Sequence, residues 1–406
     1  MTTEQIEAIG PEFTGFLRPF ENYFGSPHNV RHFRNYTRGL LTDLDRKTAE
    51  PMALYAGVPP RSLQQFLKAC IWDHEGLADA VRRRLLMATH SIAAGSIGTV
   101  GIIDETSGQK KGIKTPGVQR QYLGCVGKVD NGIVTVHLTI ARGTFKAMLD
   151  GELFLPKSWD EDRERCREAD IPDDVRYRSK WWIALELIGR AESNGWSFDW
   201  LTFDEWYGGK PGFLSMLDLA DAQYVGEVPK NFSCRPRRCL TKMSAEAVFS
   251  RPNERIRRAR SFRIEQQTGP ATVWQAKSVP VCLGEARRPR HLLICARNRE
   301  TGEIKYFIAR MRRRTSLRRF LQVAFTRWNV EHVFRVAKSE VGLMHFEGRS
   351  YVSLKRHLAL CLVALAFVAL HTMRLRGEKS GGHIGASVSG AEESLPEIPR
   401  RATANG

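Results

Sequence analysis

Apolar side chains recur every three or four residues through much of the first hundred positions, which places them on one face of a helix. This spacing predicts helices within residues 28–92, in the segments VRHFRNYTRGLL, RSLQQFLKACIW and LADAVRRRLLMA. The segment GVPPRS separates the first two, and Ser62 is placed to cap the helix after it. We expect a compact helical unit with arginines on its outer faces. A DNA-binding or dimerising module and a structural cap both fit this pattern.

From residue 98 the pattern changes to short apolar runs rich in β-branched residues. IGTVGIID and GIVTVHLTI predict strands, with glycine turns between them. RSKWWIALELIGRAESNG at 178–195 predicts a helix ended by Asn194 and Gly195, and FDWLTFDEWYG predicts a strand that breaks at Gly208. Strand, hairpin, helix and strand in this order indicate an α/β domain.

Residues 225–314 predict antiparallel strands separated by arginine-rich connections, as in TVWQAKSVPVCLG and HLLICARNRETGEIKYFIA. Helices resume at about Ser316. The most apolar run, LALCLVALAFVAL at 358–370, is shorter than the roughly 20 residues that span a bilayer, so we expect a buried core helix. Residues 377–406 are rich in Gly, Ser, Ala and Glu, a composition typical of disorder.

The charge of the chain narrows the classes of partner. Its 406 residues include 62 Lys and Arg against 44 Asp and Glu, a net charge of +18, which favours a polyanion such as nucleic acid or an anionic membrane. The polar, acidic start MTTEQIEAIGPEF is unlike a signal peptide. The eight cysteines are scattered without a disulfide or zinc framework, which indicates reduced thiols in a bacterial cytoplasm.

Three carboxylates are candidates for a metal site. Asp104 ends the run VGIID, Asp204 ends DWLTFD, and Glu331 lies in a predicted helix, TRWNVEHVFRVAKSEVGL. Adjacent strands can place two aspartates close together, and a packed helix can add a glutamate, giving the oxygen ligands that Mg²⁺ prefers. The alternative for each is an ordinary strand-end or helix-surface acid. Glu105 adjoins Asp104, but strand alternation predicts that it faces the opposite side.

Two cations accompany Glu331. Arg327, Glu331 and Lys338 are four and seven residues apart, so a continuous helix would place them along one stripe. A metal-binding carboxylate between two phosphate-binding cations suits a site that cuts phosphodiesters. An exposed ladder of ion pairs, worth roughly 0.3–0.5 kcal/mol each, is the alternative.

Three blocks resemble bacterial insertion-sequence transposases of family 701. They are DETSGQKKGIKTPGVQRQYLGCVGKVDNGIVTVHLTIA, FDWLTFDEWYGGKPGFLSML and WNVEHVFRVAKSEVGLMHFEGRSYVSLKRHLAL. These transposases are DDE enzymes with a tyrosine–arginine–glutamate–lysine signature around the glutamate. Arg327, Glu331 and Lys338 match that spacing, whereas Ala324 occupies the tyrosine position.

The resemblance implies a ribonuclease-H-like catalytic domain in an α/β chain. The expected organisation is a helical N-terminal domain at 1–95, a catalytic domain at 96–224 and 315–376, a β-rich insertion at 225–314, and a tail at 377–406. Asp104, Asp204 and Glu331 become the catalytic, metal-binding triad. Two Mg²⁺ ions, replaceable by Mn²⁺, would support strand cleavage by water and strand transfer by a 3′-hydroxyl.

The implied partner is double-stranded DNA, both terminal inverted repeats and target, in a homodimeric complex in the bacterial cytoplasm and away from membranes. Phosphate contacts are expected from five cations: Arg327, Lys338, Lys111, Lys114 and Arg120. For the last three, a solvated charged turn is the alternative. Trp206 and Tyr207 are candidates for stacking on an exposed base, with core packing as the alternative for at least one of them. Two other functions remain open: a domesticated DNA-binding protein, and a nuclease of the same fold.

Overall fold

Five α-helices and one 3₁₀ helix form the N-terminal part of this computed structural model, which describes residues 3–237, 239–250, 259–265, 271–311 and 315–378. They are α1 (Thr3–Leu17), η1 (Arg18–Tyr23), α2 (Pro27–Leu40), α3 (Ala49–Tyr55), α4 (Pro60–Lys68) and α5 (His74–Thr89). The three predicted helices are confirmed as α2, α4 and α5. Ser62 does not cap α4, because that helix already begins at Pro60, whose fixed φ suits a first turn.

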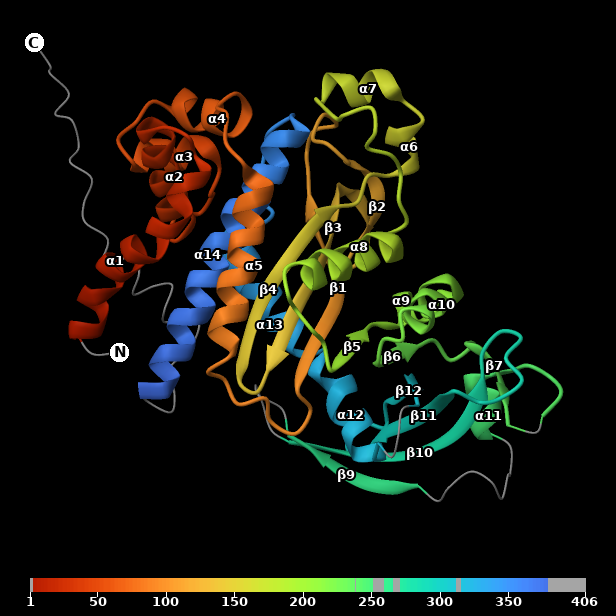
Figure 1. Ribbon diagram of the computed structural model, residues 1–406. Coiled ribbons are helices and arrows are strands. Elements are labelled where there is room, and N and C mark those ends of the chain that lie inside the picture. The colour runs from red at the N-terminus through yellow and green to blue at the C-terminus, as the bar shows by residue number, and fades with distance from the viewer. Residues whose placement is uncertain (1–2, 238, 251–258, 266–270, 312–314, 379–406) are drawn as a thin grey trace, which may run out of the picture.

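The central sheet begins as an antiparallel meander and continues with two parallel strands (Figure 1). Its strands are β1 (Thr99–Gln109), β2 (Gln119–Leu123), β3 (Lys128–Arg142), β4 (Phe145–Leu153), β5 (Trp200–Phe203) and β6 (Tyr224–Val228). β3 pairs antiparallel with β1, β2 and β4, whereas β5 runs parallel to both β1 and β6. The mixed sheet with its helices confirms the predicted α/β class.

The chain between β4 and β6 supplies helices around this sheet. They are α6 (Lys157–Asp160), α7 (Arg163–Glu168), α8 (Lys180–Ser193), α9 (Glu205–Gly208) and α10 (Pro211–Leu219). The predicted helix at 178–195 is confirmed as α8, and Gly195 follows it with a φ of +89°, a left-handed conformation that glycine adopts without strain.

The strands after β6 extend the same sheet. They are β7 (Ser233–Pro236), β8 (Met243–Ser244), β9 (Arg260–Ile264), β10 (Thr272–Cys282), β11 (His291–Asn298) and β12 (Ile304–Arg310), with α11 at Ala245–Ser250. β12 pairs antiparallel with β6, so twelve strands of the described chain form one sheet. The boundary predicted at residue 225 therefore falls inside β6, a strand of the central sheet.

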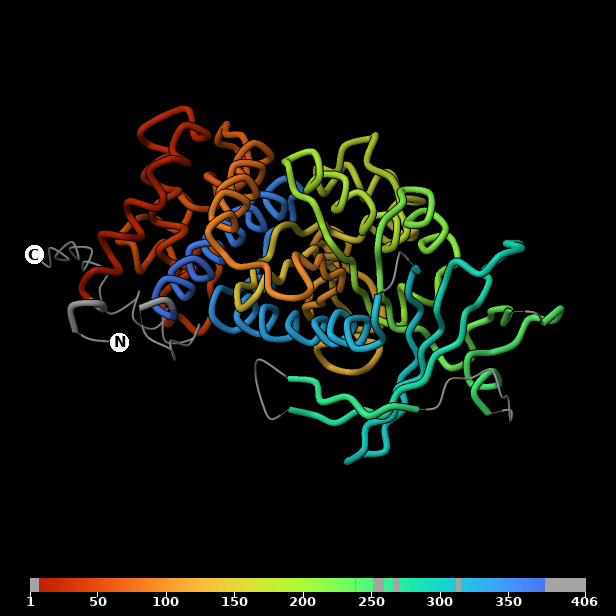
Figure 2. The backbone as a smooth tube through the Cα atoms, turned by 60° about the horizontal axis from the view of Figure 1, so that its bottom comes forward, coloured from red at the N-terminus to blue at the C-terminus, as the bar shows by residue number. Residues whose placement is uncertain are grey.

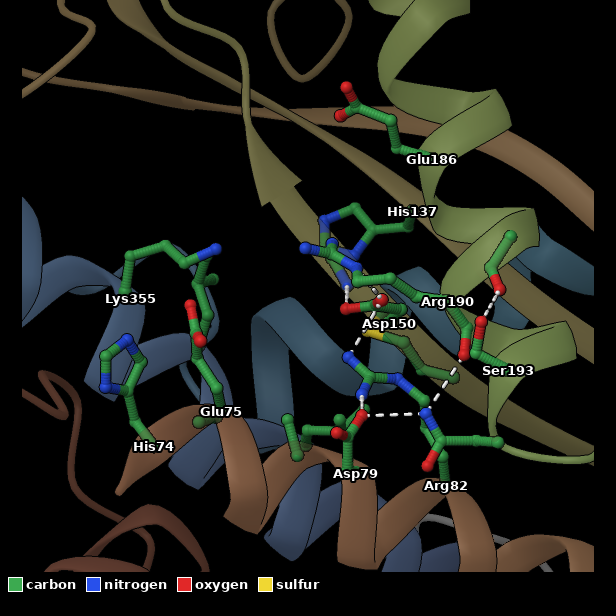
Figure 3. A pocket seen from close by; sticks show the side chains of 18 of the residues that line it. His74, Glu75, Asp79, Arg82, His137, Asp150, Glu186, Arg190, Ser193 and Lys355 are labelled. Atoms are coloured by element: carbon green, nitrogen blue, oxygen red, sulfur yellow. Dashed lines mark hydrogen bonds and ion pairs between the residues drawn. The ribbon is translucent and has the colours of Figure 1, made fainter. Parts of the chain in front are cut away.

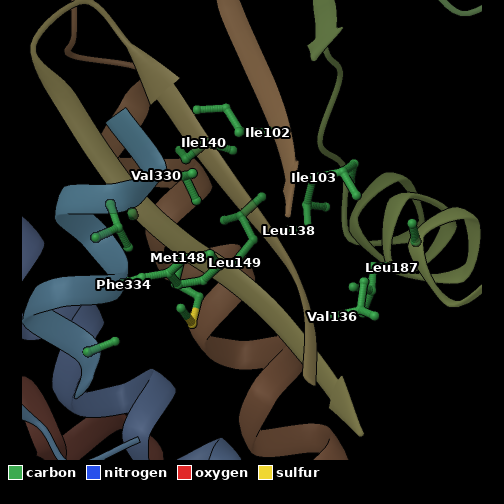
Figure 4. Close-up of a cluster of buried hydrophobic side chains, with 14 of the residues drawn as sticks. Ile102, Ile103, Val136, Leu138, Ile140, Met148, Leu149, Leu187, Val330 and Phe334 are labelled. Atoms are coloured by element: carbon green, nitrogen blue, oxygen red, sulfur yellow. The ribbon is translucent and has the colours of Figure 1, made fainter. Parts of the chain in front are cut away.

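The C-terminal helices return to the central sheet. They are α12 (Leu317–Thr326), α13 (Asn329–Arg335), the π-helical turn η2 (Val336–Glu340) and α14 (Tyr351–Glu378). Val330 and Phe334 of α13 lie against Ile140 of β3 and Met148 of β4, while Leu187 of α8 lies on the other side of the strands (Figure 4). Two opposite faces of the sheet are thus covered by α13 and α8.

The apolar run 358–370 lies within α14, the predicted core helix. The helix has the length and composition to cross a bilayer, but 83% of its apolar window is buried inside the protein. The helix has 28 residues and ends at Glu378. The tail predicted at 377–406 lies outside the described residues from 379 onward.

The N-terminal helices share a core with α14. The Tyr36 hydroxyl lies 2.8 Å from Nδ1 of His357, and the rings of Phe13 and Phe367 are 4.7 Å apart. Figure 2 shows these helices and the strands β9–β12 at opposite ends of the molecule. The N-terminal helices and the C-terminal helix α14 therefore form one packed unit.

Candidate active site

Asp104 lies inside strand β1. The antiparallel partner β3 continues beside β1 as far as Gln109, so the prediction that the strand ends at Asp104 is wrong. The parallel partner β5 does stop there, since its last paired residue, Phe203, is opposite Ile103. Asp104 is therefore the first residue of β1 beyond its parallel pairing with β5, and β5 does not continue beside it.

Asp204 comes directly after β5 and begins the short helix α9. Its carboxylate accepts hydrogen bonds from the backbone N–H groups of Trp206, at 3.0 Å, and Tyr207, at 3.2 Å. The strand predicted to reach Gly208 instead ends at Phe203, because this capping interaction turns the chain into a helix. The neighbouring parallel strands β1 and β5 thus place Asp104 and Asp204 near each other, at the point where β5 ends.

Burial raises the pKa of both aspartates. Burial raises the pKa of the Asp104 carboxyl to about 7, Asp204 adds to the rise, and the Arg327 guanidinium opposes it. Burial likewise raises the pKa of Asp204 above its ordinary value. Two partly buried carboxyls in this arrangement form a site that a divalent cation would stabilise.

The Arg327 guanidinium provides positive charge beside Asp104. Its Nη1 lies 3.4 Å from Oδ2 of Asp104, and its Nη2 lies 3.6 Å from Oε2 of Glu227 on β6. Glu227 also accepts a hydrogen bond from Nζ of Lys305 at 2.7 Å. We did not predict Glu227 from the sequence, although a single acid within the apolar run YVGEV was the available signal.

Glu105, next to Asp104 on β1, has a cationic partner of its own, although burial and, to a smaller extent, Asp204 raise the pKa of its carboxyl. Lys180 of α8 donates a hydrogen bond to its carboxylate at 2.7 Å. Asp104, one residue earlier, contacts Arg327 at the end of α12. The two adjacent acids are therefore held by helices on different faces of the sheet.

The helix that carries Glu331 is not continuous. Arg327 ends α12, and the backbone N–H of Trp328 bonds to Phe325 three residues back, at 3.2 Å. A π-helical turn at Val336–Glu340 interrupts the stretch before Lys338. The single continuous helix on which the predicted stripe of Arg327, Glu331 and Lys338 depended is therefore absent.

Glu331 itself is exposed on α13. In the described part of the chain, no three His, Cys, Asp or Glu side chains are grouped so that they could hold a metal ion. The structure thus brings Asp104, Asp204 and Arg327 together and leaves Glu331 outside that group.

The predicted phosphate-binding residues differ in environment. Lys111, Lys114 and Arg120 are exposed, and Lys114 lies 3.6 Å from Glu168. Their neighbour Lys110 is instead partly buried against the loop after η2, where its Nζ donates to the backbone oxygen of Met344 at 2.8 Å.

The two aromatic residues after Asp204 have different surroundings. Trp206 is partly exposed, with Nζ of Lys180 and of Lys210 at 4.4 and 4.5 Å from its ring. Tyr207 is fully buried beside Phe213, so stacking on a base does not fit its position. Core packing, the alternative reading, holds for Tyr207.

A separate cavity of about 530 Å³ lies between α5, α8, α14 and strands β3 and β4 (Figure 3). Asp150 accepts ion pairs from Arg82 and Arg190, both at 2.9 Å, and Lys355 lies 2.6 Å from Glu152 nearby. These paired charges connect the N-terminal helices to the sheet, which indicates a structural role.

Residues 19–280 match the family described as DDE superfamily endonuclease. The chain belongs to this family. The matched segment contains both aspartates at the sheet edge and ends before Glu331. Membership supports the ribonuclease-H-like fold, and it agrees with the meander followed by parallel strands.

The chain is also similar to a protein named "Probable transposase for insertion sequence element IS701" from Microchaete diplosiphon. The two are 31% identical over 271 residues, which cover 64% of this chain and 66% of that relative, slightly less than two thirds of its length. The resemblance to family 701 is thereby confirmed.

Proposed function

We propose that this DDE-family protein is the transposase of an insertion sequence, cutting DNA at the element's ends and joining them to target DNA. The observation that carries the proposal is the pair of partly buried aspartates at the point where β5 ends, inside the segment that matches the family. The similarity to a probable transposase and the net charge of +18 agree with DNA as the substrate.

The donor set suits a divalent cation. Mg²⁺ takes oxygen ligands and commonly uses one or two carboxylates together with substrate phosphates, which matches Asp104 and Asp204. Mg²⁺ bound there, with Mn²⁺ as a substitute, would activate the attacking oxygen and stabilise the leaving oxygen of a phosphodiester, most fully as a pair of ions.

The protein's own groups have separable roles in this proposal. Asp104 and Asp204 would hold the cation, and Arg327, which pairs with Asp104, would bind a phosphate oxygen. Glu331 is the proposed third carboxylate, and a rearrangement of the junction at Arg327 and Trp328 would be needed to bring it to the aspartates.

Double-stranded DNA, as terminal inverted repeats and as target, is the proposed partner, bound by a homodimer in a bacterial cytoplasm. Cations outside the group of acids are proposed to extend the contact to phosphates, and the partly exposed Trp206 is proposed to stack on a base. The phosphate contacts are proposed for Lys111, Lys114, Arg120 and Lys338.

The test uses the full chain, Mg²⁺ and linear DNA that carries the sequences flanking its gene. We expect wild type to nick and join this DNA, and Asp104→Asn to lose roughly 100-fold or more of the rate, because a metal ligand is removed. Asp174→Asn, at an exposed position, is the matched control.

Equal activity of wild type and Asp104→Asn would refute the proposal. Salt-sensitive DNA binding without metal-dependent cleavage would identify a DNA-binding protein of this fold instead.

A further inference from the structure

Glu227 lies on strand β6, beside the end of β5 that Asp204 directly follows. Gly226 pairs with Phe203, so Glu227 stands next to Asp204 on the neighbouring parallel strand. Its side chain is only 11% exposed. A carboxylate in such a position is costly unless cations compensate for the lost water.

Two cations from different parts of the chain provide that compensation. Lys305 of β12 lies 2.7 Å from Glu227 and is itself 15% exposed, and Arg327 lies at 3.6 Å. Glu227 is opposite Phe307 in the pairing of β6 with β12, so the backbone ladder fixes where Lys305 meets it.

Arg327 bridges two carboxylates with its two terminal nitrogens. One faces Asp104 and the other faces Glu227, so the planar guanidinium is fixed at two edges. A cation bound to Asp104 would compete with Arg327 for that carboxylate. Glu227 would then keep the guanidinium beside the acids, in reach of a phosphate oxygen.

We propose that Glu227 is a positioning residue that holds the Arg327 guanidinium beside Asp104, with Lys305 of β12 compensating its remaining charge. The inference rests on the proposed function, and it adds Glu227 and Lys305 to the proposed site. Strand β12 thereby contributes the Lys305 side chain to the support of Glu227 and Arg327.

The first test is a double-mutant cycle on thermal unfolding of the full chain, using Glu227→Gln, Arg327→Gln and the double variant. Residues in contact give non-additive effects, so the double variant should lose less melting temperature than the sum of the single losses. Additive losses would overturn the contact.

The second test measures cleavage of DNA carrying the sequences that flank the gene, with Mg²⁺. Misplacement of a reacting group by about 1 Å costs on the order of 100-fold. We expect Glu227→Gln to lower kcat by this order with unchanged KM, and Glu227→Asp to restore part of it.

Glu303→Gln is the matched control, because Glu303 also pairs with Lys305, at 3.4 Å, but is half exposed and belongs to the turn before β12. A Glu227→Gln variant that cleaves like this control would overturn the positioning role. A wild type without cleavage would refute the proposed function, whereas the unfolding cycle would still decide the contact.

Discussion

Asp204 performs two tasks with one carboxylate. It is a proposed metal ligand, and it caps α9 through the backbone N–H groups of Trp206 and Tyr207. Asparagine keeps an oxygen acceptor for the cap, whereas alanine does not, and loss of a cap costs roughly 0.5–2 kcal/mol. We expect Asp204→Asn to abolish cleavage without loss of stability, and Asp204→Ala to lower the melting temperature as well. Equal melting temperatures for the two variants would contradict the capping role.

Glu152 should make stability depend on pH. Burial alone would raise its pKa, but Lys355 and Arg190 outweigh burial and lower the pKa to about 2, from 4.5. The stabilisation is therefore complete above pH 4.5 and is lost as the pH falls toward 2.

Glu152→Gln should accordingly lose about 3–5 kcal/mol in urea unfolding at pH 7, because a buried ion pair is broken. The difference from wild type should shrink as the pH falls through this window. Glu168→Gln is the control, since its ion pair with Lys114 is exposed and worth less than about 1 kcal/mol. A Glu152→Gln penalty that is constant down to pH 3 would contradict the assignment.

At the scale of elements, the packing of α9 on β6 depends on a missing side chain. A Cβ added to Gly208 would lie 1.9 Å from the backbone oxygen of Glu227, which has no freedom to move away. Gly208→Ala should destabilise the protein by roughly 1–3 kcal/mol and impair cleavage, because it pushes α9 and Asp204 off the sheet.

Gly189→Ala is the counterpart on α8, where an added Cβ meets no atom within 4 Å. This change should raise stability by roughly 0.5–1 kcal/mol in the same thermal unfolding measurement, since alanine favours the helix. Similar effects at both glycines would contradict the close approach at Gly208.

Local patterns were sufficient to predict most of these elements. Apolar spacing located α2, α4, α5 and α8, because the buried face of a helix consists of residues only three or four positions apart in the chain. It did not show that β1 continues past Asp104, because that continuation depends on β3, whose partner residues lie about thirty positions away.

The site was predicted only in part for the same reason. Asp104 and Asp204 were identified as strand-end acids, and both lie at the edge where β5 ends. The break at Arg327 and Trp328 was not predictable, since the residues around it fit a continuous helical period. The partners of Glu227 come from β12 and α12, so its role depends on contacts that no local pattern contains.

At the scale of the whole molecule, the net charge of +18 predicts steeply salt-dependent DNA binding. If six to ten phosphates are contacted, affinity should fall by roughly 10³–10⁵ between about 50 and 200 mM salt. Fluorescence anisotropy with labelled duplex DNA measures this slope. An affinity independent of salt would contradict a phosphate-dominated interface.

The central position of α14 has a consequence for the order in which the protein is made. Phe13 and Tyr36 pack against Phe367 and His357, the last pair being 321 residues apart in the chain. At about 5–20 residues per second, the ribosome adds the distant partner roughly 15 to 65 s after the first helices emerge. During this interval the apolar faces of those helices are open to solvent and to chaperones. Truncated mRNAs that end before the codons of α14 should therefore give products that aggregate or are degraded, even though these products still contain Asp104 and Asp204.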